Sequence, residues 1–222
     1  MQSKMRMSSI NMIEKLKDPK YEGFLNDFRC KQYAKGQLVS IPGATCNDVF
    51  IVLSGRVRVY LSYEDREFTL CFLEPGDIFS THTRAFLGAT KESTLMLLSA
   101  KHFREKVIEF PEVSMIMTGV LGEVLGSTLD IVEGLIFHDA RHRMLEFILS
   151  WGENSGIWSE RGLAFKCDLS IEDISLLIGT TRQTASSLLN NFIRNGYLIK
   201  DGRKGFIISR YEDMKELFAK SF

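Results

Sequence analysis

The stretch LSIEDISLLIGTTRQTASSLLNNFIRNGYL, residues 169–198, decides the fold of the C-terminal part of this chain. It predicts two short helices around a tight turn. Apolar residues at helical spacing mark the first helix: Leu169, Ile174, Leu177 and Ile178. Ser170 followed by Asp173 is typical of a capping box at a helix start, with Asp in place of Glu or Gln. Gly179 supplies the residue without a side chain that a helix-turn-helix needs at its turn.

The second helix has a buried side and a polar side. The predicted buried residues are Leu188, Leu189, Phe192 and Ile193, and the exposed ones are Arg182, Gln183, Ser186 and Ser187. Thr180 and Thr181 can cap its first turn. Arg pairs with guanine and Gln with adenine, so this helix is suited to reading base edges in a DNA groove. An ordinary helical hairpin with a solvated face is the alternative, but turn, caps and pattern agree on DNA binding.

A predicted hairpin follows this pair of helices. Two β-type runs, residues 197–200 and 205–208, enclose the turn Asp201-Gly202-Arg203-Lys204. Arg203 and Lys204 at its tip can neutralise phosphates without reading sequence. The sequence therefore predicts a winged helix-turn-helix.

Composition limits the class of protein. The 222 residues can hold one large domain or two small ones, and the net charge of zero excludes a generally basic nucleic-acid coat protein. We find no signal peptide and expect no apolar stretch long enough to span a bilayer, which predicts a cytoplasmic protein without membrane partners. The four cysteines, Cys30, Cys46, Cys71 and Cys167, form no CxxC pair, so no zinc site or iron–sulfur cluster is indicated.

The chain divides into three predicted parts, in an α+β fold. Residues 1–110 hold an N-terminal arm and a jelly-roll-like β-roll, whose strands between residues 28 and 98 are split by turn residues such as Ser54-Gly55 and Pro75-Gly76. Residues 111–137 form a long dimerisation helix, opened by Pro111, and a hinge at residues 137–139. Residues 138–222 form the DNA-binding domain.

The long helix carries a candidate coiled-coil seam. Its members are Met117, Leu121, Val124, Thr128, Ile131 and Leu135. Such a helix can also pack on its own domain. We favour a homodimer, because helix-turn-helix proteins usually read two half-sites of a palindromic double-stranded DNA with two-fold symmetry.

A β-roll, a long helix and a winged helix, in that order, resemble the CRP/FNR family of bacterial transcription regulators. The matching motifs are SGRVRVYL at 54–61, EPGDIF at 74–79 and IGTTRQTASSLLN at 178–190. The resemblance implies an effector-binding β-roll and a partnership with RNA polymerase, and it implies no enzymatic activity. The Arg-Ser pair of the cyclic-nucleotide members is missing, since Thr83-Arg84-Ala85 stands there, and the clustered N-terminal cysteines of the cluster-binding members are also missing.

Further segments resemble the heme-containing carbon-monoxide sensors of that family: GDIFSTHTRAF at 76–86, RVRVYLSYEDREFTL at 56–70, VLGEVLG at 120–126 and GLIFHDARHR at 134–143. The resemblance implies heme b (iron protoporphyrin IX), with His82 as one axial ligand of the ferrous iron. The N-terminal amine of Met1 of the partner subunit is implied as the other ligand, which CO displaces so that the long helices reorient. Leu121, Gly122 and Leu125 match the helix positions that flank bound CO.

Two residues depart from those sensors. Ser80 stands where they carry a cysteine that ligates ferric heme, and Gln2 is large, so Met1 is expected to be retained. Two rival functions are a regulator gated by a non-heme small molecule in the β-roll and an enzyme on a cupin-like barrel. The four histidines, His82, His102, His138 and His142, do not suggest a facial metal cluster inside one barrel, which disfavours the enzyme.

Overall fold

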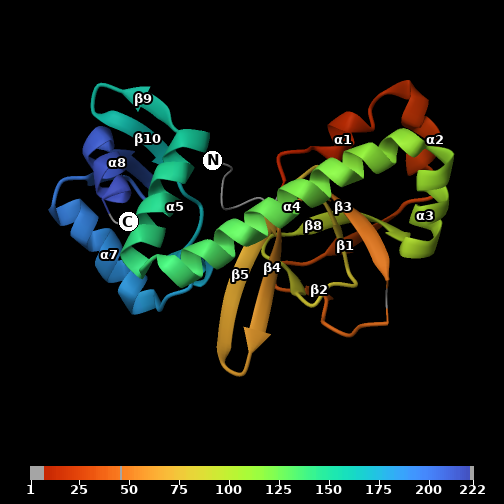
Figure 1. The fold of residues 1–222 in the computed structure, drawn as a ribbon, viewed down its shortest axis with the longest axis horizontal. Helices are drawn as coiled ribbons and strands as arrows, with labels where there is room; N and C mark the ends of the chain where they lie inside the picture. Colours follow the sequence, from red (N-terminus) through yellow and green to blue (C-terminus); the bar gives the residue numbers. More distant parts are fainter. Residues whose placement is uncertain (1–7, 46, 221–222) are drawn as a thin grey trace. The chain divides into compact units, whose positions relative to one another are not determined.

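The computed structural model describes residues 8–45 and 47–220. The chain divides into two compact units, and the division falls inside one helix, between Thr128 and Leu129. Each unit is described by itself below, with the labels of Figure 1.

The N-terminal unit is an antiparallel β-roll with short helices. Its strands form two four-stranded sheets, in the orders β1-β8-β3-β6 and β2-β7-β4-β5. The strands are β1 (Arg29–Tyr33), β2 (Leu38–Ser40), β3 (Asp48–Ser54), β4 (Val57–Tyr63), β5 (Arg66–Leu73), β6 (Ile78–Ser80), β7 (Phe86–Ala89) and β8 (Ser93–Ser99). The helices are α1 (Met12–Lys15), the 3-10 helix η1 (Pro19–Tyr21), α2 (Glu22–Leu25) and α3 (Ala100–Glu109). The predicted β-roll is confirmed.

The turns between strands lie where the sequence predicted them. Gly55 has a φ of 86°, and a side chain there would come within 2.2 Å of Ser93 Oγ. Gly76 has a φ of 94° and lies against Asn11 of the N-terminal segment, whose neighbour Met12 donates a backbone hydrogen bond to the Gly76 carbonyl (2.8 Å). Only glycine combines this backbone conformation with such a close approach.

The core of the N-terminal unit joins the short helices to the first sheet and to the long helix α4 (Pro111–Phe137). Phe24 of α2 is fully buried, and its ring meets those of Phe103 and Phe110 edge-on, with centroids 5.9 and 5.8 Å away. Val113 and Val120 of α4 belong to the same cluster of buried side chains. In Figure 1, α1, α2 and α3 accordingly gather near the N-terminal end of α4.

Helix α4 both packs on the β-roll and leaves apolar side chains exposed. Met117 and Val124 of the predicted seam are half-buried and pack against the core of their own β-roll. The exposed apolar residues of α4 are Met115, Leu121, Leu125, Leu129, Val132, Leu135, Ile136 and Phe137. The expectation that no apolar stretch could span a bilayer is wrong, because α4 is long and apolar enough by length and composition alone.

Over residues 129–220 the C-terminal unit contains the end of α4, four further helices and one sheet. Its helices after α4 are α5 (Ala140–Ser155), α6 (Ile171–Ile178), α7 (Arg182–Arg194) and α8 (Tyr211–Ala219). Its strands are β9 (Ile157–Ser159), β10 (Gly162–Lys166), β11 (Leu198–Asp201) and β12 (Gly205–Ile208), in the order β11-β12-β10-β9. The predicted winged helix-turn-helix is confirmed, and the sequence interpretation missed β9 and β10. Met144 and Leu145 of α5, Ala185 of α7 and Ile208 of β12 are fully buried in the core of this unit.

Candidate functional site

Local hydrogen bonds define both ends of the helix-turn-helix. Ser170 and Asp173 form the predicted capping box, in which the Asp173 N–H donates to Ser170 Oγ (3.1 Å) and the Ser170 N–H donates to Asp173 Oδ2 (2.9 Å). Gly179 ends α6 in the left-handed conformation, with φ 65° and ψ 50°. A residue with a side chain adopts this conformation only at a cost, so Gly179 sets the angle of the turn.

The second helix begins at a threonine cap. Thr181 is the N-cap of α7, and its Oγ1 accepts the Thr184 N–H at 3.1 Å. The Thr180 backbone N–H instead donates to the Ser175 carbonyl (2.9 Å), closing the end of α6. Of the two threonines predicted as caps, Thr181 is therefore the one that caps α7 in the structure.

The polar face of α7 is open to solvent. Ala185 and Phe192 are the buried residues of this helix, and Leu188, Leu189 and Ile193 are half-buried. The opposite face lines one shallow hollow with six polar side chains: Arg182, Gln183, Ser186, Ser187, Asn190 and Arg194. Arg182 has an exposed carboxylate of Glu172 at 3.9 Å, too far to hold the guanidinium away from a stronger anion.

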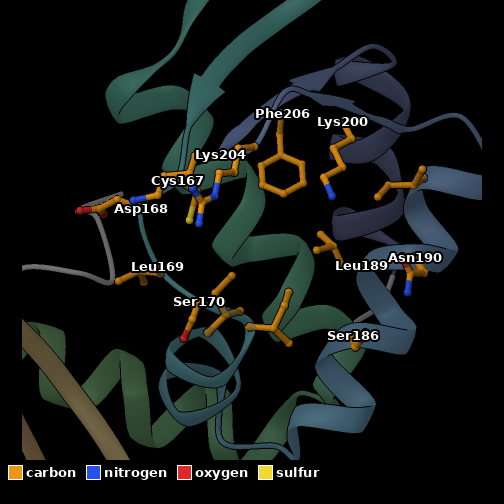
Figure 2. Close-up of a pocket in the computed structure, with 14 residues that line it drawn as sticks. Cys167, Asp168, Leu169, Ser170, Ser186, Leu189, Asn190, Lys200, Lys204 and Phe206 are labelled. Atoms are coloured by element: carbon orange, nitrogen blue, oxygen red, sulfur yellow. The ribbon is translucent and has the colours of Figure 1, made fainter.

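The wing lies beside this helix, across a second pocket of about 420 Å³. Figure 2 shows Lys200, Lys204 and Phe206 from the wing and Ser186, Leu189 and Asn190 from α7 among the residues around it. Arg203 also lines the pocket, and Lys200, Arg203 and Lys204 are exposed. The candidate base-reading helix and the basic tip of the wing therefore meet at one pocket.

Two polar residues of the α7 face were not among the predicted contacts. Asn190 and Arg194 follow Ser186 at steps of four, so they continue its row along the helix surface by one and two turns. The predicted contacts cover only the first two turns of the helix, although the helical spacing also indicates Asn190 and Arg194.

His82 lies in the bend between β6 and β7 and is exposed. The adjacent Thr81 is buried and anchors the bend: its N–H donates to the Asp48 carbonyl and its Oγ1 accepts the Asp48 N–H, both at 2.9 Å. The Ser80 hydroxyl forms a short hydrogen bond with Nδ1 of His82. Ser80, the last residue of β6, thus orients the imidazole of His82. Nε2 is the ring nitrogen that can bind another partner.

Three more residues of the predicted effector site lie on α4. Leu121 and Leu125 are 63% and 61% exposed, and a Cβ added to Gly122 would meet nothing within 4 Å. A Cβ on Gly119, by contrast, would lie 3.1 Å from Cδ1 of Ile10. A single chain therefore leaves an open apolar surface at the candidate CO-flanking positions.

The N-terminal segment is tied to the same helix. Ser8 Oγ donates to Glu123 Oε2 (2.8 Å), the Ser9 N–H donates to the same oxygen (2.6 Å), and Ser9 Oγ donates to Oε1 (3.0 Å). Met1, the second predicted iron ligand, lies outside the described residues.

A β-roll followed by a long helix and a winged helix-turn-helix with an open polar recognition face defines a DNA-binding transcription regulator with an effector-type N-terminal unit. Residues 30–109 match the family model for the cyclic nucleotide-binding domain, and residues 142–217 match that for the Crp-like helix-turn-helix domain. The chain belongs to the CRP/FNR family of bacterial transcription regulators, whose members bind DNA as dimers.

Similar proteins of known structure include two carbon-monoxide sensors. A mutant of CooA from Carboxydothermus hydrogenoformans is 41% identical, with a TM-score of 0.91 over 97% of this chain and 99% of that one. The reduced CO-sensing protein from R. rubrum is 33% identical, with a TM-score of 0.56 over 94% of this chain and 99% of that one. The global nitrogen regulator of Synechococcus elongatus is 26% identical over 78% of this chain and 82% of its own length.

Proposed function

We propose that this chain is a heme-dependent, carbon-monoxide-sensing transcription activator that binds palindromic DNA as a homodimer. The observation that carries the proposal is the 41% identity to CooA over 97% of the chain, combined with an exposed, oriented His82 in the segment GDIFSTH. We propose residues 1–110 as the sensing part, 111–137 as the dimerisation helix and hinge, and 138–222 as the DNA-binding part. RNA polymerase is the proposed partner in activation, and the cytoplasm the proposed location.

The residues at His82 suit a heme iron. A neutral imidazole is a good iron ligand, and metal-binding histidines commonly have their second ring nitrogen engaged in a hydrogen bond. The Ser80 hydroxyl meets that condition at Nδ1, so that Nε2 can coordinate iron. Ser80 is a poor substitute for a thiolate ligand, so its proposed role is to orient His82.

The exposed surface of α4 suits the apolar faces of a porphyrin. Leu121 and Leu125 offer apolar contact area, and Gly122 leaves open space between them. Burying such side chains stabilises a complex by about 25 cal/mol per Å². When bound, heme supplies an iron centre at which CO binds; the chain supplies the imidazole, the apolar enclosure and the second ligand.

The proposed second ligand is the N-terminal amine of Met1 of the partner subunit. An α-amine has a pKa of about 7.7–8, so it is partly deprotonated near neutral pH and can donate its lone pair. The hydrogen bonds of Ser8 and Ser9 to Glu123 anchor the start of this arm on α4. Seven residues from Ser8 can extend at most about 25 Å, which limits where the amine can bind.

On the DNA side, we propose that Arg182 and Gln183 read base edges. Thr180, Thr181, Ser186 and Ser187 would support them from the same helix start, and Asn190 and Arg194 extend that surface. Arg203 and Lys204 of the wing would contact phosphates.

An absorption spectrum of the purified protein tests the sensor half of the proposal. We expect a Soret band, a six-coordinate low-spin ferrous form after dithionite, and a shifted band after CO. Colourless protein that does not take up added heme would overturn the proposal and favour a regulator gated by a non-heme small molecule in the β-roll.

A further inference from the structure

We propose a second metal site, for a divalent transition ion such as Zn²⁺, made by His138, His142 and Glu146. One ligand atom from each of these three side chains lies within 4.8 Å of the other two. The site belongs to the C-terminal unit and uses none of the residues proposed for heme.

The spacing explains why the three side chains meet. His142 and Glu146 lie four residues apart on α5, so they share one face of the helix. His138 lies one residue before the N-cap Asp139, another four positions back, and its ring centroid is 3.9 Å from that of His142. The backbone of a single helix start therefore holds all three side chains on one line.

The donor set suits zinc. Two imidazole nitrogens and one carboxylate oxygen form a familiar ligand set for this ion, with water in the fourth position. Two ligand atoms that each lie about 2.1 Å from a tetrahedral ion are roughly 3.4 Å apart. The ligand atoms here lie within 4.8 Å of one another, so ion binding requires them to approach by little more than about 1 Å. The His142 side chain is 1% exposed, and its ring centroid lies 4.4 Å from that of Phe218. This burial limits the competition of water with the imidazole for the ion. The negative charge of Glu146 offsets part of the ion's charge.

The ion would join two pieces of backbone. His138 lies in the turn between α4 and α5, whereas the other two ligands lie on α5. The neighbouring Arg143 already donates to the carbonyls of His138 and, at 2.6 Å, Ile178 at the end of α6. A bound ion would therefore stiffen the segment that leads from α4 into the helix-turn-helix.

The test uses the whole chain of 222 residues as purified, with weakly bound metal removed by a chelator, followed by dialysis against Zn²⁺. We expect one zinc per chain that is absent in His138→Asn and Glu146→Gln, or bound at least about tenfold more weakly. Both residues are half-buried, and these variants keep the buried His142 itself in place; circular dichroism checks their fold. Zinc should also raise the melting temperature of the wild type more than that of either variant.

Two controls separate this site from others. His102→Asn removes an exposed histidine of α3, and His82→Ala removes the proposed heme ligand; both should keep the zinc. Equal zinc affinity in wild type, His138→Asn and Glu146→Gln would overturn the proposal, as would wild-type protein that binds no zinc. Loss of zinc in His82→Ala alone would assign the ion to the other unit, and would also contradict this site.

Discussion

The two candidate sites of this protein differ in how much of each a single chain completes. The proposed DNA contacts come from residues 180–204, and caps, turn and wing hold them in one unit. The proposed effector-site residues come from the N-terminus, the bend at His82 and the middle of α4, where the apolar surface stays open. A site built from one supersecondary motif is complete in one chain, whereas a site proposed to be shared by two copies and a cofactor leaves exposed surface.

The largest expected effect is on the effector side. His82→Ala should abolish the six-coordinate ferrous spectrum, because it removes the proposed iron ligand. His102→Ala is the matched control, since His102 is also exposed and its Nδ1 also pairs with a serine, at 2.9 Å from Ser99 Oγ. Absorption spectra of reduced protein measure both. An unchanged spectrum in His82→Ala would break the comparison, because the effector site would then lie elsewhere.

A side chain at Gly122 should remove most CO-dependent DNA binding. In a single chain a Cβ at Gly122 meets nothing within 4 Å, so Gly122→Leu should leave the fold intact and still bind heme and CO. Any loss must then arise from crowding of the bound cofactor or of the partner helix. Fluorescence anisotropy on operator DNA, with and without CO, measures the response, and Gly122→Ala should reduce it less. A full response in the leucine variant would exclude this part of α4 from signalling.

On the DNA side the expected effects are moderate. Arg182→Ala should cost about 1–3 kcal/mol of specific binding and relax one base position, because a bidentate contact to a base edge is lost. Competition binding against single-base variants of the operator measures it. The ratio of specific to scrambled DNA should fall; a constant ratio would mean that α7 does not read sequence.

The cap of α7 should contribute to stability. Thr181→Ala should lower the free energy of unfolding by about 1 kcal/mol, since the Thr184 N–H loses its acceptor. Thr180→Ala is the control, because Thr180 engages its backbone at the end of α6 and not its side chain at the start of α7. Urea unfolding compares the two. An equal loss of unfolding free energy in the two variants would show that the Thr181 cap does not stabilise α7.

The smallest effect is expected at the wing. Lys204→Ala should weaken binding to all DNA sequences alike and reduce the slope of log affinity against log salt by about one. Titrations at several salt concentrations measure this slope. If the variant changes specificity and leaves the slope unaltered, the wing reads bases and not phosphates.

Much of the C-terminal unit could be predicted because its signals are local. The capping box at Ser170, the left-handed turn at Gly179 and the hairpin tip depend on residues a few positions apart. Strand β9 was missed because its three residues are all exposed and show no alternation. The periodicity of α4 predicted a helix correctly, but it did not show which apolar face covers the chain's own core. The half-buried Met117 and Val124 of the predicted seam pack on the β-roll, a contact that the periodicity alone could not show.

In the candidate sites, too, the sequence indicates individual residues but not the contacts that the fold creates between them. His82 could be identified from a sequence segment, while its pairing with Ser80 depends on the geometry of the bend. His138, His142 and Glu146 have helical spacing in the sequence, yet only the observed start of α5 brings their ligand atoms together.

Arg143 has a consequence for local unfolding. Its guanidinium donates to the carbonyls of Gly134 and His138 at the end of α4 and to those of Ile178 and Gly179 at the end of α6. Burial lowers its pKa, but an arginine stays protonated, so these bonds persist at any physiological pH. The two helix ends should therefore open as one cooperative segment, with amide protons that exchange with deuterated solvent together. In Arg143→Lys a single ammonium group replaces the planar guanidinium with its several N–H donors. The ends of α4 and α6 should then unfold separately.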